Sequence, residues 1–336
     1  MTVNNTTDGF DYDYDYVDEL CGKEEVVKVG SILIPLFFTL VVVLSCIGNI
    51  LVLVILALYE SLKYMTNVFI LNLALSDLLF TFGLPFWASY HIWGWTFEEI
   101  GCKAVKFLFY VGFYSSVLFL TLMTVQRYMA VVHPLSDWEK CRGFSVAPII
   151  VWILSGLAAL LVSVYNKVQQ DPFTNITHCE YDRTEVKHGI IYFQNVFFFI
   201  AFVVMGFCYT RMLQTITKAR TKKRHKTVRL IFCIALMFFI GWAPYNIVIF
   251  LSSLTYHNVH PFTKCTISIN LDYAFYVCRL LAYSHCCLNP VFYVFVGVKF
   301  RNHLKMILQT IFQPKKKTFH SQQDKLAKNH SQSSTY

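Results

Sequence analysis

The sequence predicts an all-α membrane protein: a seven-transmembrane helix bundle with a short amphipathic eighth helix. Of its 336 residues 56% are hydrophobic and 15% are charged, with 31 Phe and 20 Tyr, a balance that suits lipid as the solvent. A spanning helix needs about 20 mainly apolar residues. Runs of that kind occur near residues 32–58, 67–90, 103–132, 145–165, 188–217, 226–254 and 267–297.

Each of these runs is expected to be a helix and not a strand. They are apolar on all sides and too long for the roughly 10-residue alternating strands of an outer-membrane barrel. In hydrocarbon, a helix satisfies its backbone groups within one segment. The two halves of the chain contain no fixed-period repeat of the kind that marks many transporters.

The charges predict how the bundle crosses the membrane. Residues 1–28 carry eight acids and two lysines, a net charge of −6, whereas residues 211–229 carry eight Lys or Arg and no acid. Residues 299–328 add eight basic residues against Asp324. Because positive charge concentrates on the cytoplasmic side, we expect an extracellular N-terminus and a cytoplasmic C-terminus. The net charge of +9 is then a cytoplasmic excess that faces anionic lipid, and we expect no nucleic-acid partner.

The N-terminal segment is predicted to be an acidic extracellular tail, residues 1–30. It lacks the basic start and apolar core of a cleavable signal peptide, so the first span is expected to act as its own signal anchor. Tyr12, Tyr14 and Tyr16 alternate with aspartates, which could indicate a period-2 strand. A tail is favoured because aspartate is depleted in strands and the like charges would line one face. Tyrosines flanked by acids are substrates of secretory sulfotransferases, so we expect sulfation.

The cysteines and glycosylation sequons are consistent with this topology. Cys141 is expected on the reducing cytoplasmic side, and six further cysteines lie within spans: Cys46, Cys208, Cys233, Cys278, Cys286 and Cys287. Four cysteines remain on the oxidising side, which allows three pairings: Cys21, Cys102, Cys179 and Cys265. Glycosylation is predicted on the same side at Asn4, Asn5 and Asn175.

Asp77 is the single carboxylate deep within a predicted span. An isolated charge there either takes up a proton or recruits a cation and hydrogen-bond donors. Polar residues in spans generally face the bundle interior or a water-filled cavity. Both states of Asp77 therefore remain open at this point.

The order of polar motifs along the chain resembles the rhodopsin-like (class A) G-protein-coupled receptors over residues 30–312. The series comprises "GNILV" at Gly48 and Asn49, "LALSD" ending at Asp77, Cys102 followed 25 residues on by Arg127 in "QRYMAVVHP", Trp152, Tyr209, "WAP" from Trp242 and "NPVFY" from Asn289. Each motif is weak alone, but seven in this order are specific. The resemblance implies a bundle over residues 31–298, an amphipathic juxtamembrane helix over 299–312 and a cytoplasmic tail over 313–336.

Within that class the chain resembles the chemokine receptors. The features are "SHCCLNPVFY", "WAPYN", a short third cytoplasmic loop and the outer cysteines Cys21 and Cys265. "KYMTNVFILNLALSDLLF" and "YVFVGVKFRNHLK" resemble the lymphotactin (XC-type) branch. Arg279 stands where most chemokine receptors have glutamate, and Ala201 where most have proline.

The resemblance implies a plasma-membrane receptor that binds a basic, lymphotactin-like chemokine and activates a heterotrimeric G-protein of the inhibitory type for chemotaxis. An acidic N-terminus and an outer pocket would hold the ligand. Arg279 in this pocket would attract an acidic or carbonyl-rich group. The implied ligand-binding residues are Tyr12, Tyr14, Tyr16, Trp87, Tyr90, Lys106, Phe109, Tyr110, Tyr245, Asp272, Tyr276 and Arg279. An ion pair between Asp272 and Arg279 is the alternative for that arginine.

The resemblance also implies two disulfides and a buried ion site. It pairs Cys102 with Cys179 and Cys21 with Cys265. It places Asp77, Ser116 and Asn289 around a sodium ion, with Asn49 and His285 nearby, while a protonated Asp77 is the alternative. No other cofactor is expected.

Coupling and activation are implied at the cytoplasmic side and in the bundle core. Arg127 is usually braced by a preceding acid, but this chain has Gln126, and Arg224 on the opposing helix would repel it. We therefore expect a weakened resting brace. The residues implied are Arg127, Tyr128, Tyr209, Arg224, Phe238, Trp242, Asn289 and Tyr293. The Ser/Thr-containing tail is expected to bind arrestin after phosphorylation.

Other function classes fit less well. The chain has no zinc-ligand spacing, no second intramembrane carboxylate and no serine nucleophile motif, so we expect no enzyme. An atypical scavenging chemokine receptor without G-protein output is the first alternative. A membrane transporter is the second.

Overall fold

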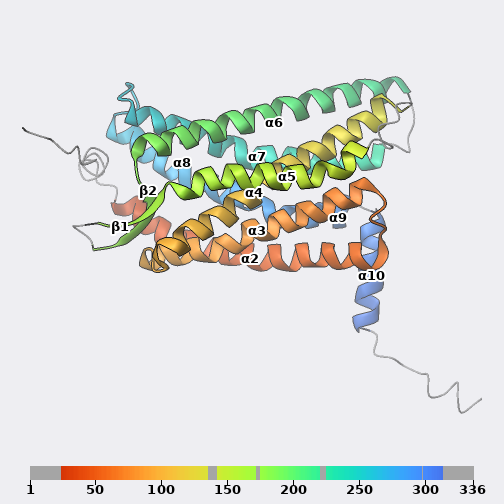
Figure 1. Ribbon diagram of the computed structural model, residues 1–336, viewed down its shortest axis with the longest axis horizontal. Helices are drawn as coiled ribbons and strands as arrows, with labels where there is room; N and C mark the ends of the chain where they lie inside the picture. Colours follow the sequence, from red (N-terminus) through yellow and green to blue (C-terminus); the bar gives the residue numbers. More distant parts are fainter. Residues whose placement is uncertain (1–23, 135–141, 172–174, 220–224, 297, 313–336) are drawn as a thin grey trace, which may run out of the picture.

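The computed structural model describes residues 24–134, 142–171, 175–219, 225–296 and 298–312. Long helices lie side by side along one axis, and one short helix crosses that axis (Figure 1). In chain order the elements are α2 (Glu24–Tyr59), α3 (Met65–Trp93), α4 (Glu98–Val132), α5 (Arg142–Val164), β1 (Asn166–Gln170), β2 (Thr177–Tyr181), α6 (Thr184–Ala219), α7 (His225–Tyr256), α8 (Cys265–Tyr283), α9 (His285–Val296) and α10 (Val298–Phe312).

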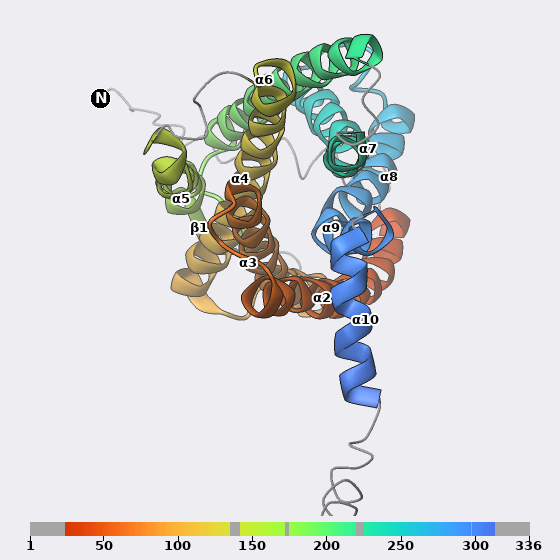
Figure 2. The ribbon, with the colours of Figure 1, turned by 90° about the vertical axis from the view of Figure 1, so that its right-hand side faces the viewer.

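The two ends of the bundle carry different elements. We call the end with β1, β2 and the Cys102–Cys179 disulfide the disulfide end, and the opposite end, where α10 crosses, the α10 end. Seen along the bundle from the α10 end, the helices form a ring and α5 lies outside it, against α4 (Figure 2). The helix α4 also contacts α3, α6 and α7. It is therefore the element around which the others pack.

The predicted helical membrane bundle is confirmed. Six helices of the described chain are long and apolar enough to cross a membrane: Lys28–Tyr59, Met65–Trp93, Glu98–Val132, Val146–Val164, Thr184–Thr217 and Ile231–Tyr256. Several extend beyond the predicted apolar runs, because backbone hydrogen bonding continues where lipid contact ends. The helix α3, for example, ends only at Gly94, whose φ of 74° is in the left-handed region and whose N–H donates to Tyr90 O.

The seventh predicted span, 267–297, is two helices in the structure. The boundary lies at Ser284, whose N–H donates to Leu280 O at 3.1 Å and whose carbonyl accepts from Cys287 N at 3.1 Å. The second of these bonds is one residue shorter than an α-helical bond, so the chain tightens there. Apolarity alone could not reveal this boundary.

A proline in α9 determines how that helix meets α2. Pro290 has no N–H, so the carbonyl of Cys286 loses its intrahelical donor. The Asn49 Nδ2 donates to that carbonyl at 2.8 Å, and Ser45 Oγ lies 3.3 Å from it. Gly48 makes the approach feasible, because a Cβ there would lie 2.8 Å from the Pro290 ring. The Cys286 carbonyl, which lacks a donor in its own helix, and the absence of a side chain on Gly48 thus determine how α2 packs against α9.

The closest approach of α3 and α4 also requires a glycine. A Cβ on Gly112 would lie 2.8 Å from Phe80 Cα and 2.8 Å from Ser76 O, both of which are backbone atoms that cannot rotate away. Small residues at such crossings are what allows close helix packing in lipid. Nearby, Ser115 Oγ donates to Ser76 Oγ at 2.7 Å across the same contact.

The hairpin of β1 and β2 was not expected from the sequence. Its strands pair antiparallel from Asn166 with Tyr181 to Gln170 with Thr177. The disulfide between Cys102 and Cys179 fastens β2 to α4, which confirms that predicted pairing. With only five residues each, the strands are too short to produce a clear alternating pattern.

We expect Gly112→Ala to destabilise the bundle. The added methyl group would meet backbone atoms, and overpacking of this kind costs about 1–3 kcal/mol of unfolding free energy. Thermal unfolding of the purified protein in detergent measures the effect. Gly156→Ala is the matched control, since a Cβ there meets nothing within 4 Å. Equal midpoints for both variants would contradict the close-approach argument.

We also expect Asn49→Leu to lower the free energy of unfolding by about 1–3 kcal/mol, because it removes the donor to a buried carbonyl. The control is Asn195→Leu, since Asn195 Nδ2 bonds only within its own helix, to Ile191 O at 2.9 Å. The same thermal assay should separate the two variants. A loss no larger than that of the control would show that α9 does not depend on Asn49.

Candidate functional site

Arg279 projects from α8 into a cluster of aromatic side chains at the disulfide end. Its Nη2 donates to His91 Nε2 at 2.8 Å. Arginine can only donate, so His91 accepts and its ring is neutral in this arrangement. The guanidinium carbon lies 5.1 Å from the ring centre of Phe275, 5.4 Å from that of Tyr276 and 6.0 Å from that of Phe38. A cation is thus held by π faces and by one imidazole.

The alternative pairing of Arg279 with Asp272 is not present. Both residues lie in the described part of the chain, and no ion pair joins them there. Asp272 is partly buried on α8 and has interactions of its own. The contacts that the structure shows for Arg279 are therefore His91 and the surrounding aromatic rings.

Lys106 on α4 is a second cation of this region and is buried, with 7% of its surface exposed. Its Nζ lies 5.4 Å from the ring centre of Trp87 and 4.7 Å from that of Tyr181. No carboxylate of the described residues lies within ion-pair distance of it. Burial raises the pKa of the Tyr181 phenol above its ordinary value, so Tyr181 stays neutral beside the ammonium.

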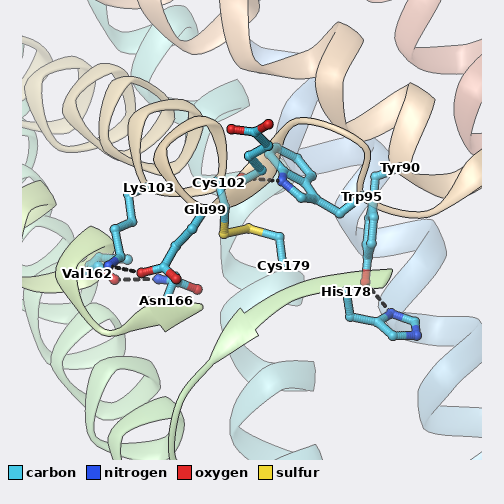
Figure 3. Close-up of a disulfide and its surroundings, with 10 residues drawn as sticks. Tyr90, Trp95, Glu99, Cys102, Lys103, Val162, Asn166, His178 and Cys179 are labelled. Atoms are coloured by element: carbon cyan, nitrogen blue, oxygen red, sulfur yellow. Dashed lines mark hydrogen bonds and ion pairs between the residues drawn. A yellow bond between two sulfur atoms is a disulfide. The ribbon is translucent and has the colours of Figure 1, made fainter. Parts of the chain in front are cut away.

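The hairpin of β1 and β2 and the helix α3 cover the surroundings of Lys106 and Arg279 at the disulfide end. Figure 3 shows the Cys102–Cys179 disulfide beside the hydrogen bond of 2.9 Å between Tyr90 Oη and His178 Nδ1. Trp95, whose Nε1 donates to Glu98 O at 2.9 Å, packs against Tyr90 with ring centres 6.3 Å apart. A wall of aromatic side chains is thereby fixed to two helices and one strand.

Aromatic rings continue from this wall toward the bundle centre. Phe109 packs against Tyr110 at 5.5 Å and against Trp87 at 6.2 Å between ring centres. Tyr245 on α7 reaches Trp242 at 5.6 Å. The predicted pocket residues Trp87, Tyr90, Lys106, Phe109, Tyr110, Tyr245, Tyr276 and Arg279 therefore all lie in connected aromatic surroundings at one end of the bundle.

Trp242 is packed at the centre of the bundle below these rings. Its ring centre lies 4.3 Å from that of Phe113 on α4, 5.3 Å from that of His285 and 6.0 Å from that of Phe238. Phe238 in turn packs against Phe198 on α6 at 6.4 Å. Movement of Trp242 must therefore displace side chains of α4, α6 and α9.

The carboxylate of Asp77 is buried and accepts two hydrogen bonds. Ser116 Oγ donates to Oδ1 at 3.0 Å, and Asn289 Nδ2 donates to Oδ2 at 2.7 Å. His285 Nδ1 lies 2.8 Å from Ala282 O, while its Nε2 lies 3.9 Å from Asp77 Oδ1. The oxygens of Asp77 and Ser116 could ligate a small hard cation, whereas Asn289 turns its N–H toward the carboxylate and acts as a donor.

The predicted coupling residues lie at the α10 end. Tyr209 Oη lies 3.2 Å from Thr124 Oγ1, and Tyr128 Oη lies 3.2 Å from His133 Nε2. Tyr293 is buried against Phe300 of α10, with ring centres 5.9 Å apart. Arg127 contacts the first turn of α3. These side chains surround one end of α4.

Some predicted sites cannot be placed. Asn175 is exposed on the turn between β1 and β2, with φ of 56°, and its glycosylation stays a prediction. Cys265 is in a disulfide, but its predicted partner Cys21 is not among the described residues, so that pairing stays a prediction. Also outside the described residues are Asn4, Asn5, Tyr12, Tyr14, Tyr16 and Arg224.

Sequence reasoning missed several partners of the predicted residues. His91, His178 and Tyr181 contact Arg279, Tyr90 and Lys106 respectively. None belongs to a recognisable motif, and none stands out by hydropathy. Their positions near a helix end and in a short hairpin gave no signal that could have identified them.

Comparison with known proteins identifies the family of the chain. The domain described as "7 transmembrane receptor (rhodopsin family)" matches residues 48–293. The chain is similar to "Chemokine XC receptor 1" of Homo sapiens, with 40% identity over 300 residues, 88% of this chain and 87% of that relative. "Chemokine XC receptor 1" of Mus musculus is 39% identical over 306 residues, 89% of this chain and 90% of the relative.

A C-C type relative is similar as well. "Probable C-C chemokine receptor type 3" of Mus musculus is 36% identical over 313 residues, 91% of this chain and 86% of the relative. Such receptors are signalling proteins and not enzymes, and they cross the plasma membrane several times. The chain belongs to the chemokine receptor family of rhodopsin-like seven-transmembrane receptors.

Proposed function

We propose that the chain is an XC-type receptor that binds a basic, lymphotactin-like chemokine on the disulfide side and activates an inhibitory-type heterotrimeric G-protein on the α10 side. The observation that carries the ligand proposal is the pair of cations among aromatic rings, the half-buried Arg279 and the buried Lys106, neither of which forms an ion pair with an acid of the described residues. The names of the XC-type relatives support the chemokine class.

The proposed orientation follows from charge. The acidic residues 1–28 lead into α2, whereas basic residues concentrate in 211–229, where α6 ends and α7 begins, and in 299–328, whose described part is α10. By the positive-inside rule the disulfide end is extracellular. A disulfide is stable on that side and reduced in the cytosol, which supports the same assignment.

Ligand binding has two parts in this proposal. The acidic tail attracts the basic body of the chemokine and raises its association rate. The pocket then receives the N-terminal segment of the ligand. There Arg279 exchanges the neutral acceptor His91 for an acidic or carbonyl group, and the resulting charge-assisted bond is stronger than the one it replaces.

A sodium ion at Asp77 and Ser116, arrestin binding to the phosphorylated tail and contacts with anionic lipid complete the proposal. Ser116 and Asn289 both donate to the Asp77 carboxylate, and the oxygens of Asp77 and Ser116 are the donor set that a sodium ion would use. His285 lies close to the same carboxylate and competes for the space that a hydrated ion would need.

G-protein activation is the defining test. Purified receptor in nanodiscs is mixed with an inhibitory-type G-protein and a panel of basic chemokines, and nucleotide exchange is measured. We expect at least one XC-type chemokine to accelerate exchange. Ligand uptake by cells without exchange would favour a scavenging receptor, and substrate flux in liposomes would favour a transporter.

We expect Arg279→Gln to weaken chemokine binding roughly tenfold or more, because it removes a charge-assisted bond worth about 1.5–3 kcal/mol. Radioligand binding on membranes measures this loss. Lys103→Gln is the control: it removes the same charge at the same end, but Lys103 is exposed and paired with Glu99 at 2.5 Å. A similar, small change for both variants would remove Arg279 from the site.

Changing Tyr12, Tyr14 and Tyr16 together to Phe should weaken ligand capture. Three sulfates would take the tail from −6 to about −9, and the lost field acts over a longer range when salt is low. Association rates should therefore fall more at low ionic strength than at physiological salt. Rates equal to those of the wild type at both salt concentrations would refute a docking role for these tyrosines.

A further inference from the structure

The hydrogen bond between His91 and Arg279 is one that a proton would break. Arg279 Nη2 donates to His91 Nε2 at 2.8 Å. Because arginine has no acceptor atom, the imidazole must offer the lone pair of Nε2, and its own proton is on Nδ1. A proton on Nε2 would remove that lone pair and place a second positive charge against the guanidinium. Protonation of His91 and its bond to Arg279 therefore exclude each other.

The neighbours of this pair do not offset a second positive charge. His91 is partly buried on α3, and Arg279 is the charged group of the described chain that acts on it. The nearest ring, that of Tyr90, lies 5.7 Å away between centres, and tyrosine is uncharged near neutral pH. The titratable groups around the pair are Tyr90 on α3, Tyr276 and Tyr283 on α8, Tyr245 on α7, and His178 and Glu180 on β2.

From this exclusion we infer that His91 is a second residue of the site for the ligand's acidic group, and that binding of this group takes up one proton. An entering carboxylate accepts from Arg279 Nη2 in place of His91. The freed Nε2 then takes a proton from water while Nδ1 keeps its own, and the imidazolium donates to the same carboxylate. The inference deepens the proposed function and rests on it.

The same geometry favours an anion over a neutral carbonyl as the ligand group. A carbonyl would replace one neutral acceptor on Arg279 by another, so the exchange would gain little. A carboxylate forms a stronger, charge-assisted bond and draws a second cation toward itself. Arg279 Nε is also buried and makes no hydrogen bond within the described chain, so the guanidinium has a further donor to give.

The first test measures how pH affects binding of a labelled XC-type chemokine to the receptor in nanodiscs, at about pH 7.5 and about pH 5.5. His91→Gln keeps an acceptor for Arg279 but takes up no proton. Relative to this variant, wild-type affinity should rise roughly tenfold on acidification, the effect of one histidine that is held neutral before binding and titrates near pH 6.5 afterwards. His260→Gln, at an exposed histidine of the same end, is the control and should behave like the wild type.

Two further measurements need no chemokine. Without any ligand, the unfolded chain binds a proton at His91 more readily than the folded one, so acidification from about pH 7.5 to about pH 5.5 should lower the wild-type unfolding midpoint by roughly 2 °C more than that of His91→Gln. Inorganic sulfate is a dianion at both pH values. At matched ionic strength it should stabilise the wild type more at the lower pH, and His91→Gln equally at both.

The outcomes separate this inference from the proposed function. The same pH dependence of chemokine binding in the wild type and His91→Gln overturns proton uptake on binding. The same response to sulfate in both proteins overturns the part of His91 in an anion site, whatever the chemokine result. If sulfate acts as expected but no chemokine binds at either pH, the proposed function fails while the anion site stands.

Discussion

The bundle depends on one carbonyl group that its own helix cannot satisfy. Pro290 offers no N–H to Cys286 O, and in lipid no water replaces the missing donor. Asn49 supplies it from α2, and Gly48 lets the two backbones come close enough for so short a side chain to reach. A residue that would weaken an isolated helix therefore determines which helix lies beside it. The polar groups around Asp77 are collected at the same level of the bundle as a result.

Between the two ends, α4 is one uninterrupted helix that carries residues of both proposed sites. Lys106 lies near its start among rings, and Arg127 lies near its end, where it donates to Thr66 of α3. Phe113, between them, touches Trp242. A rigid element of this length can transmit a change of packing at its centre to its end without any change in its own shape. The two cations differ in the neighbours that are described: aromatic rings surround Lys106, whereas Arg127 contacts a hydroxyl of α3.

Much of the fold could be predicted because lipid imposes a simple rule on composition. Long apolar runs identified the spans, and the unusual Arg279 indicated one wall of the proposed site. Contacts between spans could not be predicted, because they depend on which helix faces meet. His91 and Thr66 illustrate this: each is an ordinary polar residue near the end of α3 until a cation on another helix approaches it. The break at Ser284 was missed for a related reason, since hydropathy carries no information on hydrogen-bond spacing.

The strand β2 performs three tasks within five residues. It carries Cys179 for the covalent link to α4, His178 for the bond to Tyr90 on α3, and Tyr181 for the ring that covers Lys106. The segment that covers Lys106 and the segment that is anchored to α3 and α4 are therefore the same piece of chain. In the proposed binding mode, a ligand that displaced this strand would pull on both helices at once.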